Sequence, residues 1–393
     1  MTAVSTLIAA VLATLAGVPL AVVSLELLAG LLPGRRDDSE VGVGRCAVLI
    51  PAHNEQTGIA ETLRALHEVA PASTQILVVA DNCTDDTAAF ARSCGVEVAE
   101  RHDPTLRGKG YALAFGRERL ADSPPQFVVV LDADCRLAPG SIEALCRSAA
   151  ERQAPAQAVN LITPDLTAPP MVQISGFAMV VKNLFRSRGM QRLGGAALLT
   201  GTGMAFPWQL FTTAHLATGS IVEDLSLGIE MTRAGRAPRL VEGAQVRSAP
   251  AAMDVALQQR RRWEHGFLDT LRRQALPVLA SGIKRGSRAE ALLGLHLIVP
   301  PLALMLLLAT GVLAVCTGLL WLGASAVPAV GLGALLAVVL GLVTVAWILG
   351  GRAFLSGGAL LRAPLYILWK IPIYLSFLRK PEASWTRTPR QKP

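Results

Sequence analysis

The sequence predicts an α/β domain with a mostly parallel sheet, about three transmembrane helices, and a C-terminal amphipathic segment on the membrane surface. Of the 393 residues, 52% are hydrophobic and only 17% are charged, which is more apolar than ordinary soluble proteins. Residues 291–351 contain no Asp, Glu, Lys or Arg, and between Thr2 and Gly34 the only charged residue is Glu26. Between these blocks, short β-rich runs alternate with helical patterns, which is typical of a parallel sheet covered by helices.

The two apolar blocks are long enough for three spans, since a transmembrane helix needs roughly 20 apolar residues. We expect one helix in residues 1–34 and two in residues 291–351, with a turn at residues 323–328. Pro300 and Pro301 are expected to kink the second helix, because neighbouring helices can absorb the lost hydrogen bond. A cleaved signal peptide is the alternative for the first block, but no basic residue precedes it and its apolar stretch is long.

Basic residues next to the apolar blocks predict the orientation. They are Arg35, Arg36, Lys284, Arg285, Arg288, Arg352, Arg379 and Lys380. Cationic residues are retained on the cytoplasmic side, so we expect the N-terminus outside and residues 35–290 in the cytoplasm. The chain would then be a multi-pass protein of the inner (plasma) membrane. Because the lipid surface accounts for the net charge of +8, no nucleic acid partner is expected.

Residues 352–393 are expected to form an interfacial amphipathic segment followed by a basic cytoplasmic tail. The apolar stretch 354–378 carries Arg362 and Lys370, and Pro364 and Pro372 interrupt its periodicity. A further span would also leave the basic tail outside the cell. A segment that lies on the cytoplasmic face of the membrane therefore fits better.

The composition also excludes several classes of protein. The apolar content excludes a disordered chain and a collagen-like fibre. The six cysteines form no CxxC pair and show no zinc-site spacing, so we expect reduced thiols in a cytoplasmic domain rather than a disulfide-stapled miniprotein.

The cytoplasmic domain, residues 35–290, begins with alternating strands and helices. Strands are expected at residues 46–51, 75–81, 96–100 and 127–132, and helices at 58–69, 85–93, 141–151 and 253–271. Polar residues follow the strands, with Glu55 after the first, Asp81 after the second, and Asp132 and Asp134 after the fourth. Ligands of open α/β sheets bind at this edge, so these side chains are expected to face one crevice.

The Asp132-Ala133-Asp134 sequence suggests a metal site at that edge. No G-x-G-x-x-G follows the first strand and no G-x-x-x-x-G-K-[ST] occurs anywhere, which excludes a dinucleotide fingerprint and a P-loop. Two carboxylates at the end of a strand can instead hold a divalent cation together with phosphate oxygens. Taken alone, this pattern is weak evidence for a metal site. The motifs that surround it in the sequence decide whether the interpretation holds.

The context is a succession of seven motifs in a fixed order. They are Pro51-Ala52-His53-Asn54-Glu55, Ala80-Asp81-Asn82-Cys83-Thr84-Asp85, Gly108-Lys109-Gly110-Tyr111-Ala112-Leu113, Asp132-Ala133-Asp134, Gly201-Thr202-Gly203-Met204-Ala205, Glu223-Asp224, and Gln259-Arg260-Arg261-Arg262-Trp263. This succession resembles the membrane-bound family 2 glycosyltransferases, the group of cellulose synthase and hyaluronan synthase, whose catalytic domain has the GT-A fold. The resemblance covers residues 45–266.

The resemblance implies a nucleotide-sugar site at the first motifs. Ala52, Glu55 and Asp81 would form the uridine pocket, with Asp81 at the uracil. Lys109 would approach the nucleotide. Asp132 would bind the nucleotide sugar and, with Asp134, hold Mg²⁺ or Mn²⁺ on the diphosphate.

The later motifs imply the acceptor side and the catalytic base. Asp224 matches the base that removes the proton of the acceptor hydroxyl. Gln259 and Arg262 would bind the donor, Arg262 neutralising the leaving diphosphate. Gly203, Glu223 and Trp263 would bind the acceptor, with Trp263 stacked on the sugar. The chemistry agrees, since a single base without a second nucleophile predicts displacement with inversion.

Each of these residues also has a structural interpretation. Glu223 and Asp224 could complement the dipole of a helix expected at residues 225–231. Trp263 could be a membrane-interface anchor, and residues 260–262 a basic face that meets anionic lipid. Lys109 could be an ordinary loop cation. Only the joint pattern favours the functional interpretation.

The leading hypothesis is an inverting glycosyltransferase that moves a hexose or N-acetylhexosamine from a UDP-sugar to a glycan or lipid-linked acceptor, in exopolysaccharide or envelope glycan synthesis. Two alternatives stay open: a non-processive glycolipid synthase resembling ceramide glucosyltransferase, and a non-catalytic membrane partner that binds nucleotide sugars. Three spans are fewer than the larger polysaccharide synthases carry, and Val222 stands where many processive relatives have Thr. Besides the lipid bilayer, a homo-oligomer or other polysaccharide-export subunits are therefore candidate partners.

Overall fold

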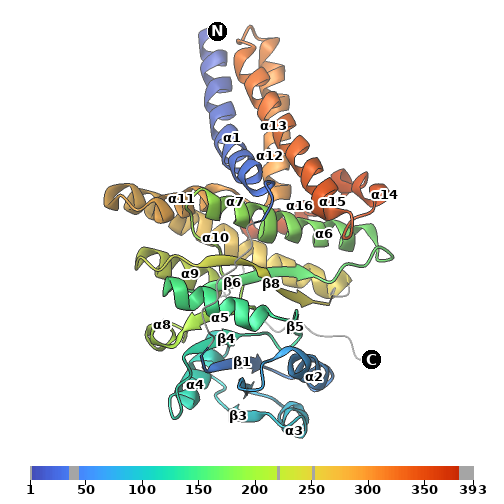
Figure 1. Cartoon of the computed structure of the whole chain (residues 1–393). Helices are drawn as coiled ribbons and strands as arrows, with labels where there is room; N and C mark the ends of the chain where they lie inside the picture. Colours follow the sequence, from blue (N-terminus) through green and yellow to red (C-terminus); the bar gives the residue numbers. More distant parts are fainter. Residues whose placement is uncertain (1, 35–43, 219–221, 250–252, 380–393) are drawn as a thin grey trace. The chain divides into compact units, whose positions relative to one another are not determined.

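The computed structural model describes residues 2–34, 44–218, 222–249 and 253–379, with only the backbone of residues 253–259. Arg35, Arg36 and the tail from Lys380 onward, which the sequence analysis singled out, lie outside the described residues. The chain divides into two compact units (Figure 1). Of the described residues, the helix unit comprises 2–33, 164–195 and 260–379, and the sheet unit comprises the others.

The sheet unit is built on one sheet of eight strands in the order β3-β2-β1-β4-β7-β6-β8-β5. The strands are β1 (Cys46–Ala52), β2 (Gln75–Asp81), β3 (Glu97–Arg101), β4 (Phe127–Val130), β5 (Cys135–Leu137), β6 (Ala156–Ile162), β7 (Met204–Pro207) and β8 (Arg239–Ser248). Strands β3, β2, β1 and β4 are parallel neighbours, as the alternating pattern predicted. Strand β7 pairs antiparallel with both β4 and β6, and β5 pairs antiparallel with β8. The expectation of a mostly parallel α/β sheet is thus confirmed.

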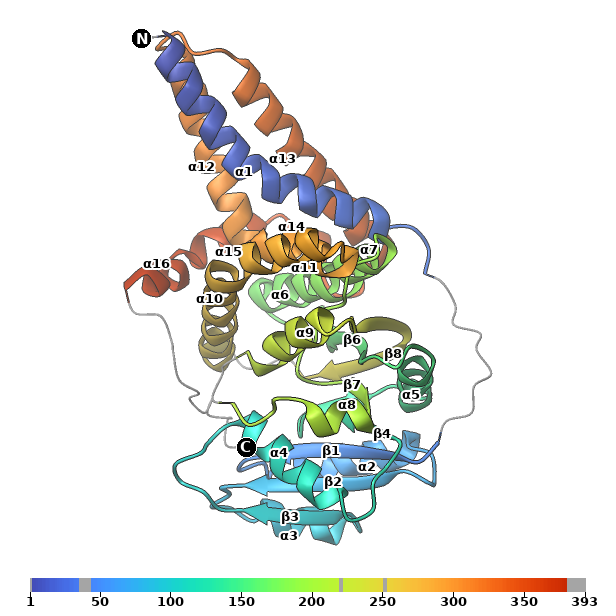
Figure 2. The same cartoon turned by 90° about the vertical axis from the view of Figure 1, so that its left-hand side faces the viewer.

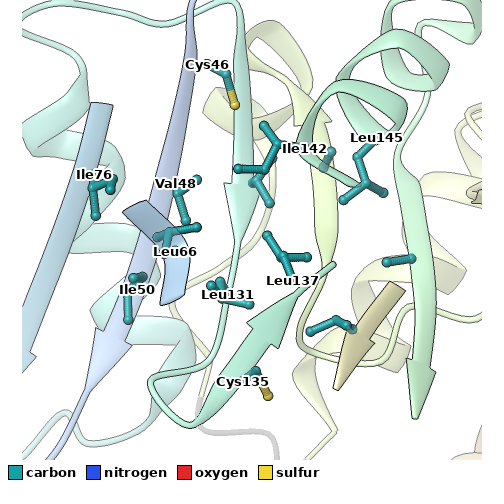
Figure 3. Close-up of a cluster of buried hydrophobic side chains, with 14 of the residues drawn as sticks. Cys46, Val48, Ile50, Leu66, Ile76, Leu131, Cys135, Leu137, Ile142 and Leu145 are labelled. Atoms are coloured by element: carbon teal, nitrogen blue, oxygen red, sulfur yellow. The ribbon is translucent and has the colours of Figure 1, made fainter. Parts of the chain in front are cut away.

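Helices cover both faces of this sheet because side chains alternate along the central strands. Cys46, Val48 and Ile50 of β1 point to one buried cluster, whereas Ala47 and Leu49 point to the other. The first cluster contains side chains of α2 (Ile59–Val69) and α5 (Ser141–Arg152) (Figure 3), and Ala91 of α3 (Thr87–Ser93). The second contains side chains of α4 (Lys109–Leu120), α8 (Trp208–Thr213) and α9 (Glu223–Arg233).

Strands β4 and β5 are consecutive in sequence but lie in different parts of the sheet. Strand β4 pairs with β1 and β7 near the middle, whereas β5 pairs with β8 at an end of the strand order. Residues 131–134 make the crossing between them. The two carboxylates of the predicted metal motif therefore lie where the chain leaves the central strands.

Among the described residues of the helix unit, three helices are long and apolar enough to cross a membrane. They are α1 (Thr2–Gly30), α12 (Leu302–Leu320), and α13 (Val327–Ala346), which continues into the π-helix η2 (Trp347–Gly351). The three helices lie side by side, with α1 in contact with both α12 and α13 (Figures 1 and 2). Their positions agree with one span in residues 1–34 and two in residues 291–351.

The expected kink at Pro300 and Pro301 is wrong, because these prolines separate two helices. Helix α11 (Arg288–Ile298) ends before them, and α12 begins at Leu302. Val299 and Pro301 both have extended backbone angles, and a proline donates no backbone hydrogen bond. The second span is therefore shorter than the sequence suggested.

Within residues 352–379, the described part of the C-terminal segment, the chain forms three short helices that are too short to cross a membrane. They are α14 (Gly357–Leu360), α15 (Ala363–Trp369) and α16 (Ile371–Arg379). Leu361, Leu368 and Leu378 are exposed, whereas Tyr366 and Tyr374 are buried. Exposed leucines on short helices with Arg362 nearby are what an interfacial segment requires.

The helix unit also includes segments that we expected in the cytoplasmic domain. These are α6 (Pro170–Val180), the π-helix η1 (Val181–Arg186), α7 (Ser187–Arg192) and most of α10 (Met253–Arg285). Helix α7 and η1 pack against α1, where Gly30 and Gly189 permit close approach. A Cβ at Gly189 would come within 1.8 Å of the Glu26 carbonyl oxygen.

Candidate active site

Lys109 lies at the centre of the candidate site in the sheet unit. It is the first residue of α4 and follows Gly108, whose φ of 133° favours glycine. Its Nζ donates to the Asp132 carboxylate and, over 2.8 Å, to the carbonyl oxygen of Gly201. Burial lowers the pKa of Lys109, but Asp132 and Glu223 more than offset this, so the net pKa is raised. Lys109 therefore joins the end of β4 to the loop before β7 as a permanent cation.

Asp132 and Asp134 offer the oxygen ligands of a divalent cation. One ligand atom from each of Asp132, Asp134 and Cys135 lies within 4.8 Å of the others. Loss of solvation and the like charge of Asp132 raise the pKa of Asp134, as expected of carboxylates that need a further positive charge. Burial raises the pKa of the Cys135 thiol well above its usual range, so it stays neutral. The remaining oxygen donors suit Mg²⁺ or Mn²⁺.

Glu223 and Asp224 begin helix α9 beside the same cation. Asp224 Oδ1 accepts the Leu225 backbone N–H over 2.8 Å, so the helix-start interpretation is correct for this oxygen. A Cβ at Gly201 would lie 3.3 Å from Asp224 Oδ2 and 3.2 Å from Lys109 Nζ. The other carboxylate oxygen therefore faces the loop that binds Lys109.

Glu223 is half-buried and has an unusual ionisation. Loss of solvation and the adjacent Asp224 raise its pKa from 4.5 to about 7. Lys109 opposes this shift without cancelling it. Shifted carboxyl groups of this kind gather at functional sites more often than elsewhere.

The predicted nucleotide residues lie at the carboxyl ends of β1 and β2. Ala52 and Asp81 are buried, and the Glu55 backbone N–H donates to Thr87 Oγ1 over 2.7 Å. Because β1 and β2 are parallel neighbours, both ends meet at one edge of the sheet. The backbone thus brings Ala52, Glu55 and Asp81 to one edge, as the sequence predicted.

Arg101 is a charged residue of this edge that sequence reasoning missed. Its Nη1 donates to Asp81 Oδ1 over 2.6 Å and to the Leu106 carbonyl oxygen over 2.8 Å, and its guanidinium lies 5.6 Å from the Tyr111 ring. The available signal was its position, because Arg101 ends β3 as Asp81 ends β2. Asp81 therefore presents a carboxylate that already has one cationic partner.

Four further residues were predicted for the site, namely Gly203, Gln259, Arg262 and Trp263. Gly203 adopts a φ of 63° and packs against Ala158 and Val246, so it shapes the loop before β7. The side chain of Gln259 lies outside the described residues. Arg262 and Trp263 belong to the helix unit, where Trp263 is 42% exposed. The roles of all four stay predictions.

Comparison with known proteins identifies a family and solved structures that this chain resembles. The family described as "Glycosyltransferase like family 2" matches residues 44–266, which is more than half of the chain. No curated protein matches the sequence.

Solved structures with a similar arrangement share little sequence with this chain. One is the mannosyltransferase PcManGT from Pyrobaculum calidifontis in complex with GDP-Man and Mn²⁺. It is 15% identical, with a TM-score of 0.54, over 94% of this chain and 100% of that one. Glucosyl-3-phosphoglycerate synthase from Mycobacterium tuberculosis, with Mn²⁺, UDP and phosphoglyceric acid, is 19% identical with a TM-score of 0.39, over 57% of this chain and 78% of that one. The likeness to PcManGT supports the GT-A fold.

Proposed function

Because the chain belongs to the family 2 glycosyltransferases, we propose that it transfers a hexose or N-acetylhexosamine from a UDP-sugar, with inversion, to a glycan or lipid-linked acceptor. One observation carries this proposal. Lys109 binds Asp132 and the Gly201 carbonyl, and Gly201 in turn adjoins Asp224. Lys109 is therefore close both to Asp132, a carboxylate suited to metal binding, and to Asp224, a carboxylate suited to act as a general base.

The donor side of the reaction needs positive charge at the leaving diphosphate. Asp132 and Asp134 would hold Mg²⁺ or Mn²⁺, which supplies that charge when bound. Their oxygen atoms and close approach fit such an ion, and the neighbouring solved structures contain Mn²⁺. Lys109 would contribute a fixed positive charge beside Asp132. Arg262 of the helix unit is proposed to approach the same phosphates.

The acceptor side needs a base for the attacking hydroxyl. Asp224 is the better candidate, because its Oδ2 adjoins Gly201 while its Oδ1 is fixed by the start of α9. The nearby Glu223, with a pKa of about 7, would contact the acceptor, and it could donate a hydrogen bond to it only when protonated. A single base acting opposite the leaving group gives inversion.

Membrane attachment supports an acceptor at the lipid surface. The three apolar helices and the exposed leucines of the C-terminal segment would hold the enzyme at the cytoplasmic face of the inner membrane. Trp263, on helix α10, is proposed to stack against the acceptor sugar. The pathway we propose is exopolysaccharide or envelope glycan synthesis.

The test is nucleotide release by the full-length protein in native membranes. UDP- and GDP-linked hexoses and N-acetylhexosamines would be screened with Mn²⁺ or Mg²⁺, followed by mass analysis of the product. We expect one UDP-sugar to give release that EDTA abolishes. Release from a GDP-sugar alone would contradict the uridine assignment. No release from any donor, with the protein folded, would contradict the enzymatic function.

The length of the product separates two versions of the proposal. A processive enzyme gives a polymer from a single encounter, whereas a glycolipid synthase adds one sugar to each lipid.

Trp263→Leu should abolish transfer in either case while membrane insertion and UDP binding persist. Wild-type transfer by this variant would return Trp263 to a role as interface anchor.

A further inference from the structure

Strand β6 carries a buried glutamine that the reaction, as described above, does not use. Gln157 is 2% exposed and interrupts a run of apolar residues in β6. Burial of an amide is unfavourable unless its hydrogen bonds are satisfied. Its contacts therefore show why a polar residue occupies this position.

The Gln157 amide binds the loop that precedes β7. Its Oε1 accepts the Thr200 backbone N–H over 2.9 Å, and its Nε2 donates to the carbonyl oxygens of Thr202 (2.9 Å) and Gly203 (3.3 Å). Only one orientation of the amide satisfies these partners, because the reverse would set oxygen against oxygen. Asn160 of the same strand donates to Thr200 Oγ1 over 3.2 Å.

The same loop binds the catalytic cluster on its other side. The carbonyl oxygen of Gly201 accepts from Lys109, and Thr202 Oγ1 accepts the Asp132 backbone N–H over 3.1 Å. Gly201 and Gly203 have φ values of 84° and 63°, so this loop adopts a backbone conformation that needs glycine. Gln157 is thus two contacts away from Lys109 and Asp132 without touching either.

We propose that Gln157 is a positioning residue for sugar transfer. It fixes the Thr200–Gly203 loop, and the loop fixes Asp132 and Lys109 relative to Asp224. This inference rests on the proposed function of the same site, but the geometry it requires can be measured without substrate. A displacement of about 1 Å at a reacting group can lower the rate about 10²-fold, so a small shift of the loop is sufficient.

Two substitutions of similar size separate hydrogen bonding from volume. Gln157→Glu replaces the donor with an oxygen that faces the Thr202 and Gly203 carbonyls. Gln157→Met keeps the volume and removes all polar contacts. The expected order of kcat is wild type, then Gln157→Met, then Gln157→Glu, with the last reduced about 10²-fold. The metal concentration for half-maximal activity should rise in the same order.

Gln173 provides a matched control in the helix unit. It is also buried, its Nε2 donates to the carbonyl oxygens of Leu166 (2.9 Å) and Ala168 (2.8 Å), and its Oε1 accepts the Ser356 N–H over 3.0 Å. Gln173→Glu and Gln173→Met should lower the melting temperature about as much as the changes at Gln157. They should leave kcat per folded molecule within about twofold of wild type, since no catalytic loop depends on them.

Hydrogen exchange of the loop, measured on full-length protein without donor, decides the proposal independently of turnover. Gln157→Glu should accelerate exchange of the Thr200 and Gly203 amides, whereas Gln173→Glu should not. Unchanged exchange at these amides, or equal kcat in Gln157→Glu and wild type, would overturn the positioning role. If the wild-type protein were inactive but exchange in the loop still responded to Gln157→Glu, only the proposed function would be contradicted. The effect of Gln157 on the loop would stand.

Discussion

Charged side chains cluster differently in the two units of the molecule. In the helix unit, Glu26 accepts from Arg186 Nε over 2.6 Å and contacts His296 Nδ1 over 2.7 Å, and all three side chains are at most 7% exposed. Glu264 is likewise paired with Lys370, a lysine whose pKa is lowered by burial but raised on balance by Tyr366 and Glu264. Each of these carboxylates has a cation beside it.

In the sheet unit, carboxylates outnumber the cation they share. Lys109 interacts with Asp132, Glu223 and Asp224, and Asp132 faces Asp134 as well. Loss of solvation and neighbouring carboxylates raise the pKa of Glu223 and of Asp134. A carboxylate that is paired with its own cation stabilises the folded chain. Several carboxylates that share one lysine leave negative charge that a bound cation can neutralise. The comparison therefore distinguishes a structural cluster of charges from a functional one.

Removal of the negative charge from the cluster of Glu26, Arg186 and His296 should destabilise the protein. Glu26→Gln leaves Arg186 buried beside a neutral amide, and we expect unfolding in detergent to become easier by about 3–5 kcal/mol. The double variant Glu26→Gln/Arg186→Met should recover most of this loss, because no unpaired charge remains.

The exposed pair of Asp269 and Arg273, 2.9 Å apart, is the control for this measurement. Asp269→Asn should change the free energy of unfolding by at most about 1 kcal/mol, since exposed ion pairs contribute little. Equal effects of Glu26→Gln and Asp269→Asn would contradict a structural role for the buried cluster.

Removal of a negative charge from the carboxylates around Lys109 should stabilise the metal-free protein. Asp134→Asn relieves repulsion with Asp132, so the metal-free protein should melt at a higher temperature than wild type. The same change should lower metal-dependent transfer at least about 10³-fold, or about 4 kcal/mol of transition-state stabilisation. Differential scanning fluorimetry and UDP release in the presence of Mn²⁺ measure the two effects. Full activity of Asp134→Asn in chelator would refute the metal assignment.

Asp224 tests the base within the same cluster. Asp224→Asn should reduce kcat about 10²-fold, as expected for loss of general-base catalysis, while the affinity for the donor nucleotide persists. Isothermal titration with UDP and Mn²⁺, together with turnover assays, separates the two quantities. A change confined to the donor KM would assign Asp224 to binding instead.

The ionisation of Glu223 predicts how the stability of the protein depends on pH. Its pKa is about 7 in the folded protein and is raised from 4.5, so the folded state holds a proton that the unfolded state has lost between these pH values. The free energy of unfolding should therefore fall as the pH rises from about 4.5 to about 7. Glu223→Gln should flatten this dependence, measured by melting of the metal-free protein at pH 5 and pH 8. An unchanged dependence of melting on pH in this variant would show that the pKa of Glu223 is not raised in the folded protein.

Much of the fold follows from local patterns in the sequence. The strands β1, β2 and β4 begin where the apolar runs predicted, and the spans in residues 1–34 and 291–351 follow from length and the absence of charge. Pro300 and Pro301 show the limit of such reasoning, because whether a proline kinks or ends a helix depends on what packs around it. Residues 164–195 show it again, since their apolar helices pack in the helix unit although the sequence placed them in the cytoplasmic domain.

The sequence by itself determined which chemistry-bearing residues end the strands, because strand period and chain order place Asp81, Asp132 and Asp134 at one edge. Only the tertiary structure decided their partners. Lys109 with Asp132, Arg101 with Asp81, and Gln157 with the Thr200–Gly203 loop each join residues 20 or more positions apart in the chain. The physical reason is that a periodic pattern specifies a face or an edge, whereas a hydrogen bond between distant segments depends on strand order, on glycine turns and on the packing that fixes them.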